Sequence, residues 1–392
     1  MNLFKFENEK LFNYIDDYNI NALTNKLNNA FNNIKNELNI ELFIDEVYNL
    51  NQDISSIELD KVLSVKVISQ DYGLNATYNI EIPTIINGNI VKNKRRFIQK
   101  QLRDTLFVVN KELNYVRILP DIDLELDIHI LKNRENENDN KTKSKLEIKG
   151  ISTGNLIPMY LYLLKEGEED KFKDIEYIQG EYEQYKDLSK EKLFKAITIY
   201  NSSARYKKSI ILLKCLYIAS ELLKEYCTSA ADMLFISVNS LKPENIDTRD
   251  GLNLINRRVR NIEEIIFSSI LSQFIDLLSS DMELQALTRR NNIIRKIEIT
   301  KDLYDLIQLE QLDSPLANLA NKSKVTIAGG KSGFKKEQVP LSLKMLHKTS
   351  FGNLDPCITP DKEGTGVINY LSSSCKLDKY GRFLNIDYLD QF

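Results

Sequence analysis

Histidine and cysteine are both scarce in this chain of 392 residues. It has two histidines, His129 and His347, and four cysteines that form no CxxC pair: Cys215, Cys227, Cys357 and Cys375. Because zinc sites combine cysteine and histidine at short, fixed spacings, no zinc set can be assembled. Sparse, unpatterned cysteine also favours a reducing compartment, the cytoplasm.

Long apolar runs and a secretory signal are missing as well. With no run of 18 apolar residues, we predict a soluble protein that is neither exported nor inserted in a membrane. An excess of positive charge is also absent, since 53 Lys and Arg stand against 56 Asp and Glu, a net charge of −3. Overall charge therefore does not indicate nucleic acid, although a local basic face can act within a neutral whole.

A Walker A motif, the phosphate-binding loop of many nucleotide-binding proteins, is excluded too. Gly329-Gly330-Lys331-Ser332 resembles the end of a Walker A loop, but Val325 stands where that motif requires its first glycine. What remains is a glycine-rich loop in a basic stretch, residues 321–350. This stretch has seven lysines against Glu337: Lys322, Lys324, Lys331, Lys335, Lys336, Lys344 and Lys348. Such a stretch is typical of a polyanion site or of a solvated basic loop.

Both helical and strand periods occur in the N-terminal third of the chain. The length allows two or three domains. Apolar residues recur at helical spacing within residues 10–50, whereas β-branched runs at 62–68 and 78–82 predict strands. Asn87-Gly88 predicts a tight hairpin turn. The charged run 93–101 is interpreted as a solvated edge.

The middle of the chain is mainly helical in pattern. Residues 145–149 predict a strand, 154–164 a buried helix and 206–226 an amphipathic helix. Residues 133–144 are polar and low in complexity, which is typical of a loop tip.

Arg257, Arg258 and Arg260 lie just before an amphipathic pattern rich in isoleucine. The planar guanidinium fork suits phosphate recognition. The alternative is that these arginines lie on the surface and pair with Glu263 and Glu264.

Glycine and proline gather in residues 347–383. Glycine permits positive φ and close backbone approach, and proline fixes φ. The residues concerned are Gly352, Gly364, Gly366, Gly381, Pro356 and Pro360. A long, shaped loop of this kind often carries a binding or catalytic surface. A regular period returns only at 367–371, which predicts a short apolar helix.

Five segments in order resemble the β subunit of multisubunit DNA-directed RNA polymerases. They are 81–102, 116–127, 250–274, 307–330 and 347–383. The last is the most specific, being similar to the family pattern H-P-x-x-Y-G-x-x-C-P-x-x-T-P-E-G-x-x-x-G-L-x-x-x-L. The matching residues are His347, Gly352, Pro356, Thr359, Pro360, Gly366 and Leu371. Lys348, Asp355 and Asp361-Lys362 depart from the pattern.

The resemblance implies an α+β fold, the multidomain N-terminal half of a polymerase β subunit. It divides the chain into a first protrusion-like segment (1–126), a reduced lobe-like domain (127–245), a second protrusion-like segment (246–320), and a fork region with a TPEG-like loop (321–392). Length and divergence also resemble the N-terminal fragments of the split β subunits of jumbo bacteriophages.

The implied function is to contribute to the channel for DNA and the RNA–DNA hybrid, and to the wall of the active centre. Thr359 and Asp361 would lie near that centre, with no catalytic residue in this chain. The residues implied to bind nucleic acid are Arg257, Arg258, Arg260, Lys324, Lys335, Lys336, His347 and Lys348. Rifampicin binding is not carried over, because Asn321 and Lys324 stand where the family commonly has His and Arg.

The implied cofactor is Mg²⁺ held by another subunit, because this sequence offers no convincing carboxylate cluster for two-metal chemistry. The isolated chain should therefore be an inactive subunit of a nucleotidyltransferase. Implied partners are a C-terminal β fragment, the β′ subunit, DNA template, nascent RNA, NTPs and a promoter-specificity factor. The implied location is the cytoplasm of an infected bacterial host, with the virion as a second location. Two other classes fit the composition: a nucleic-acid-binding module without a polymerase, and a phage structural protein.

Overall fold

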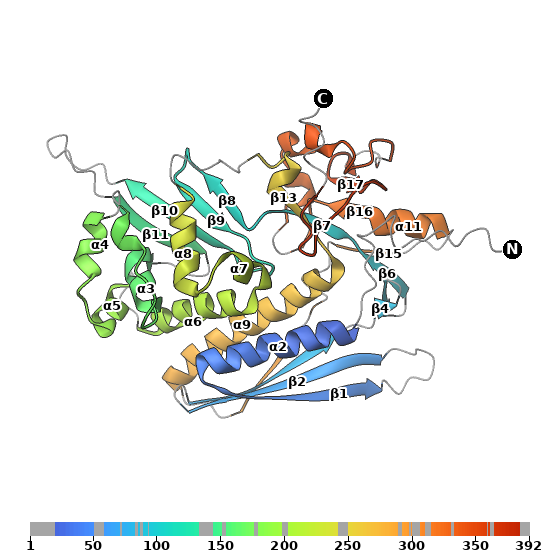
Figure 1. The fold of residues 1–392 in the computed structure, drawn as a ribbon. Helices are drawn as coiled ribbons and strands as arrows, with labels where there is room; N and C mark the ends of the chain where they lie inside the picture. Colours follow the sequence, from blue (N-terminus) through green and yellow to red (C-terminus); the bar gives the residue numbers. More distant parts are fainter. Residues whose placement is uncertain are drawn as a thin grey trace.

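The computed structural model describes residues 20–50, 59–70, 73–82, 85–86, 89–92, 94–132, 144–150, 154–175, 179–197, 203–241, 250–288, 292–297, 299, 306–309, 315–330, 333–358, 360 and 364–384. Helices and sheets share this part of the chain, as Figure 1 shows, so the predicted α+β class is confirmed. The strands that it contains form four sheets.

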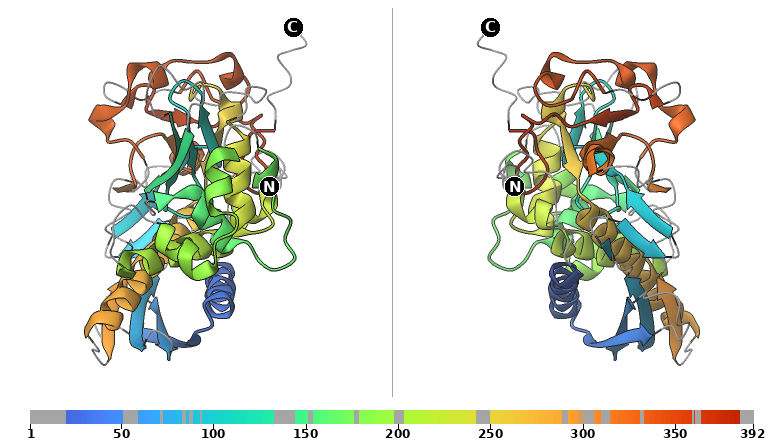
Figure 2. Two further views of the ribbon diagram at one scale, coloured as in Figure 1. Left: turned by 90° about the vertical axis from the view of Figure 1, so that its left-hand side faces the viewer. Right: turned by 90° about the vertical axis from the view of Figure 1, so that its right-hand side faces the viewer.

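The first sheet forms one end of the molecule (Figures 1 and 2). Its strands β1 (Glu41–Leu50), β2 (Leu59–Ser69) and β3 (Leu74–Ile82) are antiparallel, and β14 (Ile293–Ile297) pairs with β3 in parallel. Buried and half-buried residues alternate along β3, the two-residue period of a strand. Helix α2 (Ile20–Leu38) packs against this sheet. The prediction of helix across 10–50 is therefore wrong for 41–50, while residues 10–19 lie outside the described residues.

Helix α9 (Ile262–Thr288) connects the first sheet to the rest of the molecule. It contacts α2, β3 and α6 (Ser203–Ala219). The ring of Phe274 meets those of Phe31 and Tyr78 edge to face, with centroids 4.8 and 5.1 Å apart. Within the described residues, the stretch Ile262–Met282 is long and apolar enough for a membrane span, but 78% of its most apolar window is buried inside the protein, as in a core helix.

The second sheet has the order β12-β11-β10-β9-β8 and is covered by short helices. Its strands are β8 (Phe107–Asn110), β9 (Tyr115–Ile118), β10 (Leu126–Lys132), β11 (Ser144–Gly150) and β12 (Gly154–Asn155). The helices are α3 (Leu156–Leu163), α4 (Gln179–Tyr185), α5 (Lys190–Ala196), α6, α7 (Glu221–Tyr226) and α8 (Ala230–Asn239). Strands on both sides of residue 126 share this sheet. The domain boundaries themselves remain predictions.

The third sheet lies at the opposite end from the first and has the order β13-β7-β16-β17. Its strands are β13 (Arg257–Arg260), β7 (Lys100–Asp104), β16 (Lys324–Thr326) and β17 (Ile368–Tyr370). A fourth sheet joins β15 (Ile307–Leu309), β6 (Lys94–Ile98), β5 (Asn89–Lys92) and β4 (Ile85–Ile86). Strands β4 and β5 pair as the predicted hairpin requires, although Asn87 and Gly88 themselves lie outside the described residues.

The third sheet has a hydrophobic core of its own. Its members come from every part of the sheet and from the loops around it: Leu102, Leu254, Val259, Val325, Ile327, Ala328, Val339, Leu354, Val367, Leu371, Cys375 and Phe383. The larger core lies around α9 and the first two sheets. The helix predicted at 367–371 is wrong, because this stretch pairs antiparallel with β16 as β17. Val367 and Leu371 are buried in the core of this sheet, whereas Ile368 is half-buried.

Candidate nucleic-acid interface

The third sheet brings four distant segments of the chain into one place. Arg258 on β13 lies opposite Arg103 on β7, and Arg260 lies opposite Gln101. On the other side of β7, Thr326 of β16 pairs in parallel with Gln101. The sheet therefore places the predicted arginines beside the start of the basic stretch.

Arg258 and Arg260 are buried, each with 1% of its surface exposed. Arg258 donates a hydrogen bond from each terminal nitrogen to the Glu264 carboxylate, at 2.9 and 2.7 Å. Arg260 donates from Nε to the same carboxylate at 3.2 Å and from Nη1 to Asp123 at 2.8 Å. Glu264 is placed for this role because it lies in the first turn of α9, directly after β13.

Electrostatics in this cluster keep the acids ionised. Burial would raise the pKa of Asp123 and of Glu264, but the neighbouring guanidinium charges outweigh burial and lower both pKa values. Arg103 bonds Asp123 at 3.2 Å and Glu125 at 3.4 Å. Burial, together with the charges of Arg260 and Arg258, lowers the pKa of Arg103 to about 10. Asp123, Glu264 and Arg103 therefore stay charged at neutral pH.

Arg257 is also held by the protein. Its Nε donates to the Gly251 carbonyl at 2.8 Å and lies 3.1 Å from the Asp104 carboxylate. The guanidinium groups of all three predicted arginines therefore donate hydrogen bonds to acceptors within the protein. Pairing with Glu264, the alternative considered for them, is the arrangement of Arg258 and Arg260, although the pair is buried and not on the surface. Their contact with nucleic acid stays a prediction.

The glycine-rich loop follows β16 and folds back on itself. The Gly329 amide donates to the Phe334 carbonyl at 2.9 Å, and a bridge joins Ala328 to Phe334. Gly329 and Gly330 have φ of +90° and +72°, a region that side chains with a Cβ rarely adopt. Gly329 and Gly330 thus depend on glycine for their backbone angles, and Phe334 lies against the start of the loop.

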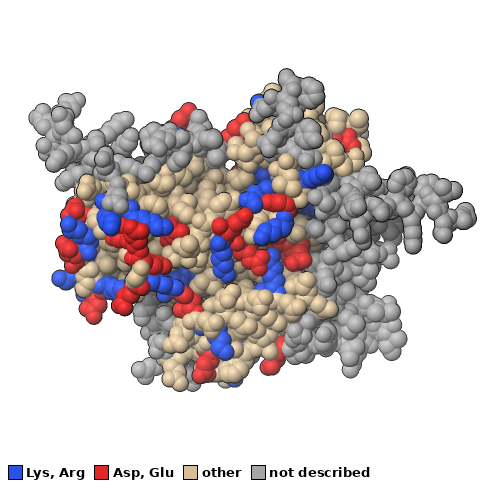
Figure 3. Space-filling model, in the orientation of Figure 1, with Lys and Arg blue, Asp and Glu red and all other residues tan. Residues whose placement is uncertain are grey.

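The predicted basic residues differ in exposure. Lys335 and Lys348 are exposed, whereas Lys324 and His347 are half-buried. Lys324 lies over the ring of Tyr370, with Nζ 5.7 Å from the centroid, and burial lowers the pKa of its ammonium. Lys336 begins a single 3-10 turn, Lys336–Gln338. Figure 3 shows basic and acidic side chains interspersed on the face that it displays.

His347 shapes the loop that follows. Its Nδ1 lies 2.8 Å from the Thr349 hydroxyl, and its backbone closes a capping box with Ser350. The Thr349 hydroxyl accepts a bond from the Leu254 amide at 3.0 Å, which fixes this turn beside β13. In this structure His347 thus organises the turn next to Lys348.

The end of the described chain closes over β13. The Val259 amide donates to the Gly381 carbonyl at 2.8 Å, and Arg258 also approaches the Tyr380 carbonyl. A Cβ on Gly381 would lie 1.9 Å from the Val259 carbonyl oxygen, so only glycine fits. Arg382 extends this contact to α7 by pairing with Glu225 at 3.1 Å.

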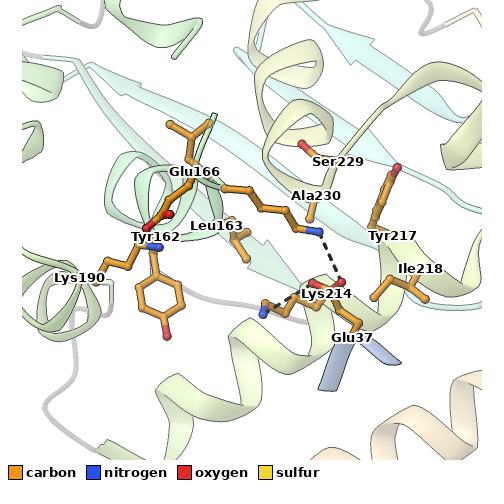
Figure 4. Close-up of a pocket in the computed structure, with 12 residues that line it drawn as sticks. Glu37, Tyr162, Leu163, Glu166, Lys190, Lys214, Tyr217, Ile218, Ser229 and Ala230 are labelled. Carbon is orange, nitrogen blue, oxygen red and sulfur yellow. Dashed lines mark hydrogen bonds and ion pairs between the residues drawn. The ribbon is translucent and has the colours of Figure 1, made fainter. Parts of the chain in front are cut away.

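Two of the predicted site residues, Thr359 and Asp361, lie outside the described residues. Within the residues that are described, no group of three or more His, Cys, Asp or Glu side chains is arranged to hold a metal ion. A cavity of about 260 Å³ lies elsewhere, beside α2, α3, α6 and α8 (Figure 4), where Lys165 and Lys214 both face Glu37. It contains no predicted site residue.

Sequence reasoning missed Gln101, Arg103 and Asp123. Each is at least nine-tenths buried. The interpretation of 93–101 as a solvated edge is therefore wrong for residues 98–101, which are buried. A polar residue does not reveal from its local pattern whether it faces solvent or a partner. The partners of Gln101 lie 159 and 228 residues away, and those of Arg103 lie about twenty residues away on another strand or loop. The repeated acids Asp121, Asp123 and Glu125 were the available signal.

Comparison with known proteins agrees with the resemblance found in the sequence. The family model described as RNA polymerase Rpb2, domain 3, matches residues 308–377, which include β16, the glycine-rich loop and β17. This segment of the chain is similar to an RNA polymerase β subunit.

Individual β subunits match over a longer stretch. The DNA-directed RNA polymerase subunit beta of Fervidobacterium nodosum is 28% identical over 151 residues, which is 36% of this chain and 12% of that protein. The subunit of Pseudothermotoga lettingae is 29% identical over 161 residues, 38% of this chain and 13% of that protein. That of Fusobacterium nucleatum is 26% identical over 157 residues, 37% of this chain and 13% of that protein. The matched stretch thus spans about an eighth of these relatives.

Proposed function

We propose that this chain is a component of a DNA-directed RNA polymerase and does the work of the N-terminal region of a β subunit. The observation that carries this proposal is the match of residues 308–377 to domain 3 of Rpb2. The match falls on the sheet that also contains Arg257–Arg260, which belongs to another of the segments that resemble the family. Two segments that resemble the family separately in sequence are therefore neighbours in space.

The proposed role is to line the path of DNA and of the RNA–DNA hybrid. Lys335 and Lys348 are exposed, and the half-buried Lys324 begins β16 of the same sheet, so these lysines supply positive charge for phosphates. The buried arginines Arg257, Arg258 and Arg260 would act from behind, by holding β13 in place. Thr359 and Asp361 are proposed to lie near the active centre. Mg²⁺ would be held by another polypeptide.

A row of exposed apolar side chains suits contact with partner subunits. Large apolar side chains are exposed along the segment between the glycine-rich loop and Gly352: Leu341 by 78%, Met345 by 63%, Leu346 by 68% and Phe351 by 66%. Exposed apolar residues in this number are typical of a surface that another protein covers. We propose that the remainder of β and the β′ subunit cover it. A specificity factor, DNA, RNA and NTPs complete the assembly.

We further propose that the chain is one piece of a split β subunit encoded by a bacteriophage. It would act in the cytoplasm of the infected host, and the virion is a second location. The support is the divergence of the sequence, which resembles that of the split β subunits of jumbo bacteriophages.

The decisive experiment is purification of the tagged chain from the cells in which it is naturally made. We expect the other polymerase subunits to co-purify and the complex to incorporate NTPs on a DNA template in a Mg²⁺-dependent manner. Salt-sensitive nucleic-acid binding without co-purifying subunits or synthesis would instead indicate a binding module. Recovery in a particle shell without either activity would indicate a structural protein.

A further inference from the structure

The side chain of Gln101 connects the buried arginine cluster to the glycine-rich loop. Gln101 lies on β7 and is 2% exposed. Its Oε1 accepts a bond from Arg260 Nη1 at 3.0 Å, and its Nε2 donates to the Gly329 carbonyl at 2.7 Å. Because a guanidinium can only donate and a carbonyl can only accept, these partners fix which way the amide points.

The loop is built closely around this amide. A Cβ on Gly333 would lie 2.7 Å from Gln101 Nε2 and 2.0 Å from the Gly329 carbonyl oxygen, and a Cβ on Gly330 would lie 3.5 Å from the same Nε2. The backbone bond from the Gly329 amide to Phe334 closes the turn. If the Gln101 side chain moved, the Gly329 carbonyl would lose its hydrogen bond and the close packing against Gly330 and Gly333 would change.

The other end of the connection is rigid. Arg260 is anchored by Asp123 and Glu264, whose pKa values are lowered by the surrounding arginines, so the anchor stays ionised at neutral pH. A continuous series of bonds therefore runs from Asp123 through Arg260 and Gln101 to Gly329. The exposed Lys335 follows Phe334 directly at the end of the turn.

We infer that Gln101 is a positioning residue: by holding the Gly329 carbonyl it fixes Gly329 and its bonded partner Phe334, and thereby directs Lys335 toward a phosphate of bound nucleic acid. This inference rests on the proposed function, because it assumes that Lys335 meets nucleic acid. The amide NH₂ group of Gln101 is the group required for this role, because it, and not the amide oxygen, bonds to the loop.

The chain offers a matched control in Gln99. This residue is 1% exposed, just ahead of the same strand, and its Nε2 has no hydrogen-bond partner among the described residues of the protein. Gln101→Met and Gln99→Met remove the same amide from equally buried sites, but only the first releases the loop. Gln101→Glu keeps an acceptor for Arg260 and removes the donor to Gly329.

The first measurement is binding of the assembled complex to a short RNA–DNA hybrid over a KCl series. Each phosphate contact contributes about −0.9 to the slope of log affinity against log salt. Gln101→Met, Gln101→Glu and Lys335→Ala should each make that slope shallower by about one contact, whereas Gln99→Met should leave it unchanged. The double variant Gln101→Met with Lys335→Ala should lose no more than either single variant. Additive losses, or equal effects of the two Gln→Met changes, would overturn the inference.

The second measurement does not depend on nucleic acid. Amide hydrogen exchange of the Gly329–Phe334 turn in the full chain should become faster in Gln101→Met and not in Gln99→Met. Unchanged exchange in Gln101→Met would overturn the inference even if the complex binds the hybrid. Failure of the wild-type complex to bind the hybrid, with the exchange difference present, would instead contradict the proposed function and the assignment of Lys335 with it.

Discussion

At the scale of single residues, Glu264 holds together the buried charges behind β13. It accepts bonds from Arg258 and Arg260, and both arginines have almost no exposed surface. Charges removed from water to this extent are stabilising only while each keeps its partner. Loss of one acid therefore affects two arginines at once.

Replacing Glu264 by Gln should lower the free energy of unfolding by roughly 3 kcal/mol or more at pH 7, because a buried pair is broken from one side. The loss should depend on pH. The pKa of Glu264 is lowered in the folded state, so its contribution is present above the unfolded pKa and is lost as pH falls through the folded one. Wild-type stability should thus decline below about pH 4.5, where unfolded Glu takes up protons.

Urea unfolding of wild type and Glu264→Gln between pH 3 and 7 tests this. The difference between them should narrow toward pH 3. Asp123 contributes to the wild-type decline with the same sign, whereas Asp121, whose pKa burial raises, contributes with the opposite sign. These two acids are common to both proteins, so a difference that does not change with pH would contradict the role given to Glu264.

Two glycines with similar backbone angles separate strain from close packing. Gly381 has φ +79° and Gly352 has φ +74°, but a Cβ on Gly381 meets the Val259 backbone, whereas nothing lies within 4 Å of one on Gly352. Gly352→Ala should cost about 1–2 kcal/mol for the left-handed conformation. Gly381→Ala should cost clearly more, because β13 must move. Thermal unfolding of both variants measures the difference, and equal shifts in Tm would count against the close approach.

At the scale of elements, α9 holds the larger core together. The Phe274 side chain, midway along the helix, touches a ring from α2 and a ring from β3. Three elements distant in sequence therefore depend on one side chain.

Phe274→Ala should lower the free energy of unfolding by about 3–5 kcal/mol, the usual cost of removing a buried aromatic ring. Leu113→Ala is the control, because Leu113 is 67% exposed and its replacement should change stability by less than about 0.5 kcal/mol. Chemical denaturation of the two variants provides the comparison. Similar values for both would show that the packing around α9 is not as described.

Element type was predictable where a period persisted over many residues. Strands β2, β3 and β11 and the buried helix α3 all agree with expectations from the sequence. The helix predicted at 206–226 is interrupted at Ser220, whose hydroxyl caps α7 by accepting from the Leu223 amide. A serine can cap a helix, but the bond from Ser220 to Asp121, in a distant stretch of the chain, is not visible in the local pattern.

The candidate site was less predictable than the fold. Residues 367–371 form a short apolar run, which fits a buried strand as well as a helix, and only pairing with β16 decides between them. That Arg257, Arg258 and Arg260 meet nucleic acid stays a prediction. Their burial was not expected, and one of the partners of Arg260, Asp123, is 137 residues away in sequence. Tertiary pairing is therefore the information that the sequence pattern lacked.

At the scale of the whole molecule, the proposed assembly divides the chemistry between polypeptides. Two-metal phosphoryl transfer needs a carboxylate cluster to hold Mg²⁺, and the proposal assigns that cluster to another polypeptide. The purified chain is therefore expected to incorporate no nucleotides by itself. Addition of the co-purifying subunits should restore Mg²⁺-dependent synthesis. Synthesis by the chain free of other subunits would contradict the proposed division of labour.

The order of strands in the third sheet also has a consequence for how the protein is made. β7 is translated early, but its neighbours β13 and β16 follow more than 150 and 220 residues later, and β17 is translated last. While the ribosome synthesises the intervening residues, the edges of β7 have no strand to pair with, and unpaired strand edges invite aggregation. The sheet that contains the candidate site can therefore close only after residue 370 has left the exit tunnel, and a pause or truncation before that point should leave the larger core folded and this end of the molecule dependent on chaperones.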